Sequence, residues 1–400
     1  MCRAKTHCFC CVFGRAAGMT SACAVVMVPA KTINLRREVL ALPRSPDVAE
    51  SPYASLPDHR FWRKAVASLP PFALDPIVET PFKIAKGEKV ATAGSCFAQE
   101  IAHQLQKSGY DYYLCEEPPQ GLSAAEARAR NYAMYSCRYG NLYTTTQLLQ
   151  LLRRAYGDYK PQLDVWRNED GRYVDPFRPR IEPDGYATAE DMRADRDRHL
   201  AAVRRMVETM DVFVFTFGLT ECWRHLPDGA VLQLAPGVAG GAFDPALYEF
   251  WNMSVGEVVR DFLESVDIIH SRNSRARMIL SVSPVSIIAT GEDRHVLVSN
   301  SASKAILRAA ADEVVRARAN IAYFPSYDLV TAAPNAARFY GDDTRRINHL
   351  GIERTMQIFF DHFMERADGA PKPGIAKLDI AAEAKSASRV ICDEEAIDAA

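Results

Sequence analysis

The sequence has no marked excess of charge of either sign. Its 400 residues include 48 Lys and Arg against 50 Asp and Glu, a formal net charge of −2. Nucleic acids and anionic membrane surfaces carry dense negative charge and therefore attract strongly basic proteins. The balanced composition gives no reason to expect such a partner, so we predict that the protein does not bind nucleic acid.

Long apolar runs are also missing. No stretch of the sequence approaches the roughly 20 apolar residues that cross a bilayer, so we predict no transmembrane segment. Arg3 and Lys5 precede "CFCCVFG", but this apolar run is short and no clean cleavage site follows it. We expect a cytoplasmic protein whose residues 1–50 are an extension without a fold, with Met19 and Met27 as alternative starts.

The ten cysteines lack the spacing of a metal site. Half of them crowd the N-terminus, and the others are single and far apart: Cys96, Cys115, Cys137, Cys222 and Cys392. Zinc sites use closely paired cysteines, and disulfide frameworks belong to small secreted domains. We therefore predict reduced thiols and no bound metal. No glycine-rich nucleotide loop is visible either, and we predict no cofactor.

What the sequence does contain is a repeated alternation of strand and helix patterns. Hydrophobic residues make up 48% of the chain, enough for a sizeable core. Five short apolar runs span residues 89–94, 110–114, 211–218, 277–284 and 321–327. Most are continuously apolar, which is typical of strands buried on both faces. We predict a three-layer α/β/α fold with a mostly parallel five-stranded sheet.

Three apolar stripes predict amphipathic helices between these strands. The first comprises Phe97, Ile101 and Leu105 and ends at Gly109. The second comprises Ala302, Ile306, Ala309 and Ala310, and the third Ile352, Met356, Phe359, Phe360 and Phe363. We predict one domain over residues 51–368 and a mobile tail over 369–400. A polar insertion at about 156–198 is either a lid over one face or an irregular insertion without a role at the site.

Polar clusters follow four of the predicted strands. They read "GSCFAQE", "GLTECWRH", "SVSPVSIIATGEDRH" and "GDDTRRINHLG". Ligands of open parallel sheets bind beyond the carboxyl ends of the strands, where these clusters meet. A serine, histidines and carboxylates at one edge are what nucleophilic acyl transfer requires. Ser95 is the candidate nucleophile, with its N–H as a donor to an oxyanion, although a serine that caps a helix is the alternative.

The first cluster carries a resemblance to a known family. "GSCFA" at residues 94–98 is the motif that names the GSCFA family, which is related to the SGNH/GDSL-like hydrolases. "SCRYGNLYTTTQLLQLLRRA", "FVFTFGLTECW", "SVSPVSIIATGEDRHVLVSNSASKAILRAA" and "YFPSYDLV" resemble that family in the same order. The resemblance implies an SGNH-like, flavodoxin-like fold with Ser95 as nucleophile. It also implies hydrolysis or transfer of the acyl group of a carbohydrate-type or other small ester.

The same resemblance implies groups that stabilise an oxyanion and bind substrate. Gly140 in "RYGNLYT" matches a glycine whose N–H helps to form the oxyanion hole, and Asn141 stands beside it. Gly218 matches the third motif of the SGNH enzymes. Thr220 stands where those enzymes have an asparagine donor, with Glu221 next to it, and its hydroxyl donates one hydrogen bond.

The last motif departs from the SGNH pattern. SGNH enzymes end with D-x-x-H, but the third residue after Asp343 is Arg346. His349 lies three residues further on, and His295 and His225 lie in loops after other strands. Three interpretations remain: His349 is the base with Asp343 orienting it, another of these histidines has taken the role, or no base is present.

Two functions therefore remain open. The first is a serine esterase or acyltransferase with a small-molecule or glycan ester as its partner. The second is a catalytically weak or inactive SGNH-like fold that binds a glycan or an acyl group, since fold alone does not fix function.

Overall fold

The computed structural model describes residues 51–70, 72–365 and 392–397. The chain divides into two compact units, Met1–Leu56 and Pro57–Ala400, and the fold below is that of the second. The predicted extension over residues 1–50 and most of the predicted tail lie outside the described residues. In the described part of the chain, no helix has the length and apolar character to cross a membrane.

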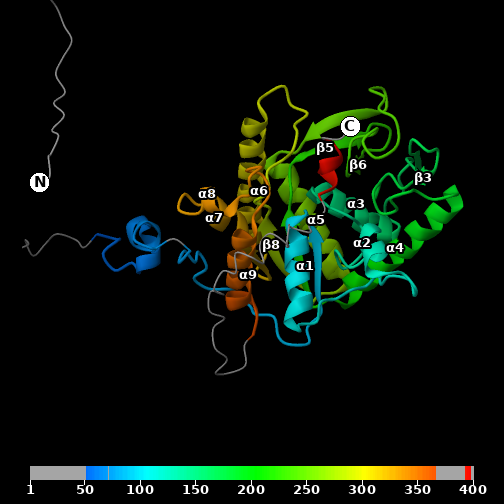
Figure 1. The fold of residues 1–400 in the computed structure, drawn as a ribbon. Helices are drawn as coiled ribbons and strands as arrows, with labels where there is room; N and C mark the ends of the chain where they lie inside the picture. The colour runs from blue at the N-terminus through cyan, green and yellow to red at the C-terminus, as the bar shows by residue number, and fades with distance from the viewer. Residues whose placement is uncertain (1–50, 71, 366–391, 398–400) are drawn as a thin grey trace, which may run out of the picture. The chain divides into compact units, whose positions relative to one another are not determined.

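A parallel sheet forms the centre of this unit (Figure 1). Its order is β1-β4-β8-β9, with bounds Val90–Gly94, Val212–Phe217, Arg277–Val282 and Ile321–Phe324. All three strand pairs are parallel, and Gly94 at the end of β1 faces Thr216 of β4. The predicted α/β class with a parallel sheet is therefore confirmed.

The predicted number of strands is wrong by one. Residues 110–114 make only an isolated parallel bridge, between Tyr112 and Val90 of β1. Two backbone hydrogen bonds hold this segment, from Val90 N–H to Asp111 O and from Tyr113 N–H to Val90 O. The segment lies beside β1 but leaves it after one bridge, so the described sheet has four strands.

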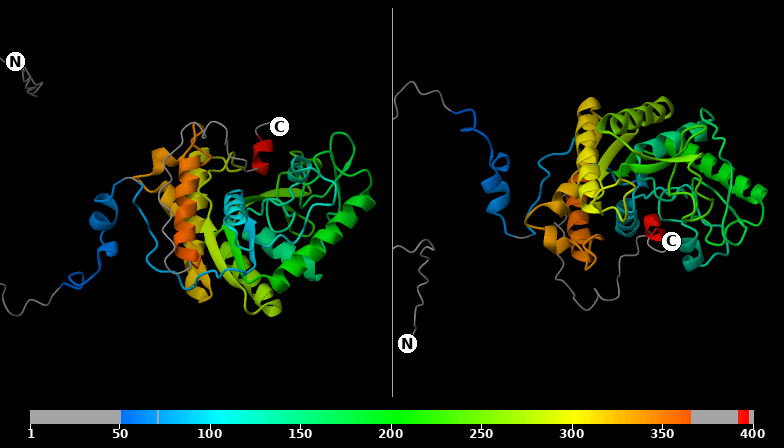
Figure 2. Two further views of the ribbon diagram at one scale, coloured as in Figure 1. Left: turned by 60° about the horizontal axis from the view of Figure 1, so that its bottom comes forward. Right: turned by 90° about the horizontal axis from the view of Figure 1, so that it is seen from above.

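Helices cover both faces of the sheet (Figures 1 and 2). Phe213, Phe215 and Phe217 of β4 point into one hydrophobic core, while Val212 and Val214 point into the other. The first core is covered by α3 (Thr145–Tyr156), α4 (Ala189–Thr209), α5 (Val255–Arg272) and α6 (Val296–Ala317). The second is covered by α1 (Phe97–Ser108), α7 (Ser326–Thr331), α8 (Ala336–Phe339) and α9 (His349–Phe363). The three-layer prediction is confirmed.

Two of the three predicted helix stripes match the buried faces. In α1 all three stripe residues are buried, and Gly109 ends the helix in a left-handed conformation. In α9 four of the five are buried. The stripe predicted for α6 is correct only in part: Ala310 is buried and Ile306 packs against the core, but Ala309 is exposed. The buried face of α6 comprises Ser299, Ser303, Lys304, Leu307, Ala310, Ala311 and Val314.

Smaller elements surround the sheet. "GLTECWRH", predicted as a loop, contains β5 (Glu221–His225), the central strand of an antiparallel sheet with β6 (Ala230–Leu232) and β7 (Tyr248–Asn252). The polar region near residue 170 forms the pair β2 (Trp166–Arg167) and β3 (Tyr173–Val174). The remaining elements are η1 (Asp58–Arg60), η2 (Arg63–Ala67), α2 (Ala124–Ala129) and η3 (Asp393–Ala396).

Buried ion pairs anchor the polar region of residues 156–198. The guanidinium of Arg178 pairs with Asp175 at 2.9 Å and with Asp195 at 3.0 Å, and all three side chains are almost completely buried. Arg138 pairs with the other oxygen of Asp195 at 3.1 Å. Charges buried in this way are held by partners on several sides, so this part of the polar region is fixed to the core.

Candidate active site

Ser95 lies between the end of β1 and the start of α1. Gly94 makes this junction possible, because it has φ +121° and approaches the backbone of β4 very closely. A Cβ on Gly94 would lie 2.3 Å from the carbonyl oxygen of Thr216. Only glycine lacks that atom, so the motif places its serine at the carboxyl edge where β1 and β4 meet.

The two polar groups of Ser95 have different surroundings. Its N–H donates to the carbonyl oxygen of Thr216 at 3.0 Å, so the N–H predicted as an oxyanion donor is engaged in this bond. Its Oγ is buried and has no hydrogen-bond partner among the described residues. Most buried hydroxyls in proteins are hydrogen-bonded, so an unpartnered hydroxyl of this kind is a candidate reactive group.

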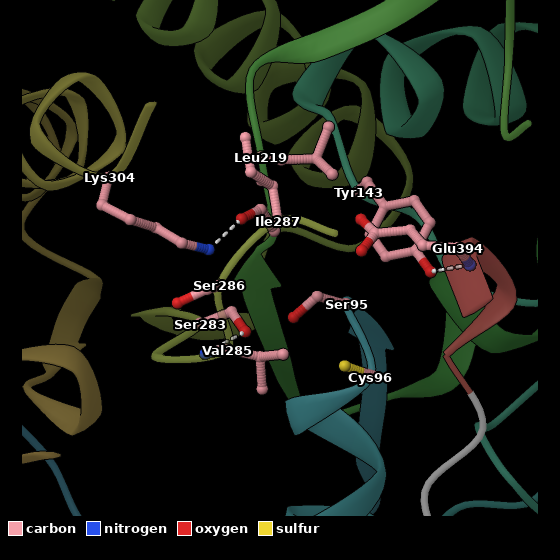
Figure 3. Close-up of a pocket in the computed structure, with 11 residues that line it drawn as sticks. Ser95, Cys96, Tyr143, Leu219, Ser283, Val285, Ser286, Ile287, Lys304 and Glu394 are labelled. Carbon is pink, nitrogen blue, oxygen red and sulfur yellow. Dashed lines mark hydrogen bonds between the residues drawn. The ribbon is translucent and has the colours of Figure 1, made fainter. Parts of the chain in front are cut away.

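Ser95 Oγ points into a narrow pocket (Figure 3). The pocket volume is about 10 Å³, which is close to the space that one water molecule occupies. Its lining residues are Ser95, Cys96, Tyr143, Gly218, Leu219, Ser283, Val285, Ser286, Ile287, Lys304 and Glu394. They come from the ends of β1, β4 and β8, from the segment before α3, from α6, and from the C-terminal η3.

Gly218 forms one wall of the pocket. Its N–H donates to the carbonyl oxygen of Tyr143 at 3.0 Å. A Cβ on Gly218 would lie 3.0 Å from Ser95 Cβ and 2.9 Å from the ring of Tyr143, so the glycine lets these two residues approach each other. The structure therefore brings Ser95 and Gly218, both predicted as site residues, into one pocket.

Lys304 reaches the same pocket from α6. Its ammonium nitrogen Nζ donates to the carbonyl oxygen of Gly218 at 2.6 Å, and the side chain is buried. Burial lowers the pKa of Lys304 to about 8, against the opposing effect of the nearby Glu394 carboxylate. Neither this lysine nor any other residue of α6 was predicted from the sequence to belong to the site.

The C-terminal segment Cys392–Ile397 also reaches the pocket, although the sequence predicted a mobile tail there. Glu394 Oε2 accepts a hydrogen bond from Arg345 Nη2 at 2.9 Å. Glu394 N–H donates to Tyr143 Oη at 3.4 Å, as Figure 3 shows. Burial raises the pKa of the Glu394 carboxyl, while the Arg345 guanidinium opposes that rise. The buried ion pair between Glu394 and Arg345 therefore holds this segment against the loop before α9.

The neighbouring Asp393 sits in a separate cradle of N–H donors. Its Oδ2 accepts from Asn141 Nδ2 and from Gln233 Nε2, both at 2.6 Å, and from Asn141 N–H at 3.3 Å. Gly140 adjoins this cradle, with φ +67° and a Cβ position only 2.8 Å from Gln233 Nε2. The predicted residues Gly140 and Asn141 therefore lie together at the position that holds the Asp393 carboxyl group, whose pKa is raised by burial.

Loss of the ion pair between Arg345 and Glu394 should make the C-terminal segment Cys392–Ile397 detach more often from the pocket. A hydrogen bond with the Cys96 thiol, together with burial, raises the pKa of the Cys392 thiol well above its usual range and makes that thiol unreactive. Arg345→Met leaves the buried Glu394 unpaired, so we expect iodoacetamide to alkylate Cys392 about tenfold faster. Peptide mass spectrometry measures the rate at this cysteine.

Arg346→Met is the matched control for that experiment. Arg346 is more than half exposed and contacts only Glu395 of the segment, at 3.3 Å, besides its own loop. We expect its effect on Cys392 alkylation to be about twofold or less, as for other exposed ion pairs. Equal alkylation rates in Arg345→Met and wild type would contradict the described docking of the segment.

Two of the predicted site residues, Thr220 and Glu221, stand at the start of the antiparallel sheet and are not among the residues that line the pocket. Thr220 is fully buried; its Oγ1 donates to Asn252 Oδ1 at 2.6 Å and its N–H to Ser303 Oγ at 3.0 Å. Glu221 accepts from Thr290 Oγ1 at 2.8 Å and from Gly291 N–H at 3.0 Å. These bonds hold the turn after β4 against α6 and the loop after β8.

The predicted histidines do not line the pocket. His349 is 43% exposed in its side chain, and its Nδ1 lies 3.5 Å from Glu353 of the same helix. His295 caps the N-terminus of α6, where its Nδ1 accepts from Leu297 N–H at 3.1 Å. His225 pairs with Asp228 at 2.7 Å. Each of these histidines has a local partner, and their proposed catalytic role stays a prediction.

Asp343 likewise has a local partner set. It accepts from the N–H groups of Arg345 and Arg346 at 3.0 and 2.9 Å, and it pairs with the Arg346 side chain at 3.2 Å. Burial tends to raise its pKa, but these hydrogen bonds outweigh that effect and the pKa is lowered. The structure thus shows Asp343 shaping the loop before α9, and its predicted partnership with a histidine stays a prediction.

A metal site is not visible in the described ranges, where no cluster of three or more His, Cys, Asp or Glu side chains is suitably placed. The site that is visible combines the buried hydroxyl of Ser95 with the buried amine of Lys304. Such a pair offers a nucleophile and a group that can carry a proton.

Comparison with known proteins identifies the family of the chain. The family model of the GSCFA family matches residues 89–359. No curated protein matches the chain. One similar solved structure is a mutant of an acetyl esterase with an acetate ion, at 9% identity and TM-score 0.29, covering 67% of this chain and 92% of that one. Another is a mutant of Axe2, an acetyl-xylooligosaccharide esterase from Geobacillus Stearmophilus, at 13% identity and TM-score 0.28, covering 72% and 100%. The family match spans most of the chain, and the chain belongs to the GSCFA family.

Proposed function

We propose that this protein is a serine-dependent ester hydrolase or acyltransferase that acts on a small acyl ester, such as an acylated carbohydrate. The observation that carries the proposal is the buried Ser95 Oγ, which faces a pocket without a hydrogen-bond partner among the described residues. A hydroxyl held in this way at the carboxyl edge of a parallel sheet is placed to attack a bound carbonyl carbon.

The start of α1 supports the same chemistry. The first N–H groups of a helix have no partner within the helix and carry its positive dipole end. The N–H groups of Cys96 and Phe97 stand at this position, directly after Ser95. In the proposed reaction they stabilise the negative oxygen that forms when Ser95 attacks the ester.

The cradle at Gly140 and Asn141 supports the proposal in a second way. Both the N–H and the side-chain amide of Asn141 donate to the Asp393 carboxylate. Donors that hold one carboxyl oxygen suit another, such as that of the released acid. Gly218 contributes by its small size, since it allows the pocket to reach Ser95.

Pocket size favours a short acyl group. A volume of about 10 Å³ next to Ser95 is the space of about one water molecule, so each carbon added to the acyl chain has to displace the side chains that line the pocket. Each extra methylene that fails to fit costs a factor of about ten or more in kcat/KM. We therefore expect kcat/KM to fall steeply from p-nitrophenyl acetate to the butyrate and octanoate, measured by release of nitrophenol. A rise with chain length would contradict the short-acyl assignment.

The binding-module alternative has one observation in its favour. The carboxylates of Asp393 and Glu394 occupy donor positions at and near the pocket, as a bound anionic ligand would. A pure binding module predicts no turnover of any ester in the panel by the wild type. It also predicts that calorimetry measures equal binding of the same esters to the wild type and to Ser95→Ala.

A further inference from the structure

The proposed reaction needs a base, and the pocket offers a nitrogen that is not a histidine. Of the residues that line it, Lys304 has the sole basic side chain. Figure 3 shows the lysine entering from α6 and the Ser95 hydroxyl directed into the same space. We propose that Lys304 is the general base that activates Ser95, in place of the histidine of the D-x-x-H motif.

Contacts around Gly218 connect the two residues. The carbonyl oxygen of Gly218 accepts from Lys304 Nζ at 2.6 Å. The Cα of the same glycine packs against Ser95, since a Cβ there would lie 3.0 Å from Ser95 Cβ. The amine is thereby fixed on one side by Gly218 and faces the serine pocket on the other. Because Ser95 Oγ has no hydrogen-bond partner among the described residues, the transfer of its proton to Lys304 runs through one water molecule, which satisfies the geometric requirement for a general base.

The surroundings of Lys304 favour its neutral form. Lysine acts as a base only after it has lost its proton, and burial makes that loss easier. The charged and titratable groups that face it are Glu394 of η3, the Cys96 and Cys392 thiols, and Arg345. Burial has the largest effect and lowers the pKa of Lys304; Glu394 and the thiols favour the ammonium form, Arg345 opposes it, and the resulting pKa is about 8. Serine–lysine pairs are a recognised variant of the serine–histidine arrangement.

Each proton has a defined path in this mechanism. The Ser95 Oγ–H proton moves to the neutral Lys304 Nζ while Oγ bonds to the carbonyl carbon of the ester. The ammonium then gives that proton to the leaving alcohol oxygen as the carbon–oxygen bond breaks, which leaves an acyl-serine. A water molecule or a second alcohol attacks the acyl carbon and passes its proton to Lys304. The lysine returns the proton to Ser95 as the acid or the new ester leaves.

The test compares two substitutions of Lys304 with two of the histidines. Lys304→Met removes the base and keeps an apolar stem that suits a buried site. Lys304→Arg keeps a positive charge that does not titrate near neutral pH. We expect both to lower kcat/KM on p-nitrophenyl acetate by about 10³-fold, a typical contribution of general base catalysis. His349→Gln and His295→Gln should stay within about twofold of the wild type.

The pH profile distinguishes a base from a merely structural lysine. A base must be deprotonated, so wild-type kcat/KM should rise with pH through about 8 and then level off. The residual activity of Lys304→Arg should lack this rise, while urea denaturation checks that the variant folds. An unchanged rise in Lys304→Arg, or a large loss in a histidine variant, would overturn the proposal.

This inference rests on the proposed function, and the two fail in different ways. Ester turnover that depends on Ser95 but survives both Lys304 substitutions overturns the lysine base alone. The absence of any Ser95-dependent turnover in the wild type overturns the proposed function, and the role of Lys304 falls with it.

Discussion

Ser95→Ala should lower kcat/KM on p-nitrophenyl acetate by about 10⁴-fold or more, because it removes the atom that bonds to the acyl carbon. The fold should survive, since Ser95 Oγ makes no hydrogen bond among the described residues and its N–H to Thr216 O bond is retained. Replacing an unpartnered buried hydroxyl by a hydrogen atom removes a desolvation cost, so the free energy of unfolding should stay equal or rise slightly. Kinetics and urea denaturation on the same preparation measure both effects.

Ser286→Ala provides the matched control. Ser286 lines the same pocket but lies in the loop after β8 rather than at the start of a helix. Its loss should change kcat/KM by less than about tenfold, the scale of one neutral hydrogen bond. Equal losses in Ser95→Ala and Ser286→Ala would show that pocket polarity, and not one nucleophile, accounts for the turnover.

Gly94→Ala should destabilise the protein strongly, by about 3 kcal/mol or more, or prevent folding. The added Cβ would meet the Thr216 backbone at 2.3 Å from O and 2.6 Å from N. Those atoms belong to β4 in the middle of the sheet, so no side-chain rotation relieves the clash. The φ of +121° adds a conformational cost for any residue with a Cβ. Urea denaturation followed by circular dichroism measures the change.

Gly87→Ala separates the clash from the backbone strain. Gly87 also has a positive φ, +91°, but a Cβ there meets no atom within 4 Å. We expect it to cost about 1 kcal/mol, the conformational part alone. If Gly94→Ala were no more destabilising than Gly87→Ala, the described approach of β1 to β4, and with it the position of Ser95, would be wrong.

The spacing of apolar residues correctly predicted those helices and strands that are buried on the face where the apolar residues lie. The helix stripe of Phe97, Ile101 and Leu105 and the apolar run of β4 match the structure, because they are buried on the faces that the pattern indicates. Residues 110–114 carry a similar apolar pattern and yet form only one bridge. The pattern indicates burial beside β1, but it does not reveal how many residues stay in register with the sheet.

The parts of the pocket that were not predicted depend on contacts between distant segments. A lysine in a helix is usually exposed, so the α6 pattern favoured Ala302 and Ala309 over the face that carries Lys304. That lysine is buried because its amine meets the Gly218 carbonyl oxygen after β4. Glu394 lies in a short polar sequence and is buried through Arg345. Gly218 and Arg345 are distant in the sequence from Lys304 and Glu394, so local sequence patterns do not reveal these contacts.

The most direct test of the account is the site at which a serine-reactive fluorophosphonate modifies the protein. The probe forms a stable bond to an activated serine hydroxyl, and peptide mass spectrometry locates the adduct. We predict one adduct, on Ser95, in the wild type and none in Ser95→Ala. An adduct on another serine, or equal labelling of the two proteins, would contradict the claim that Ser95 is the nucleophile.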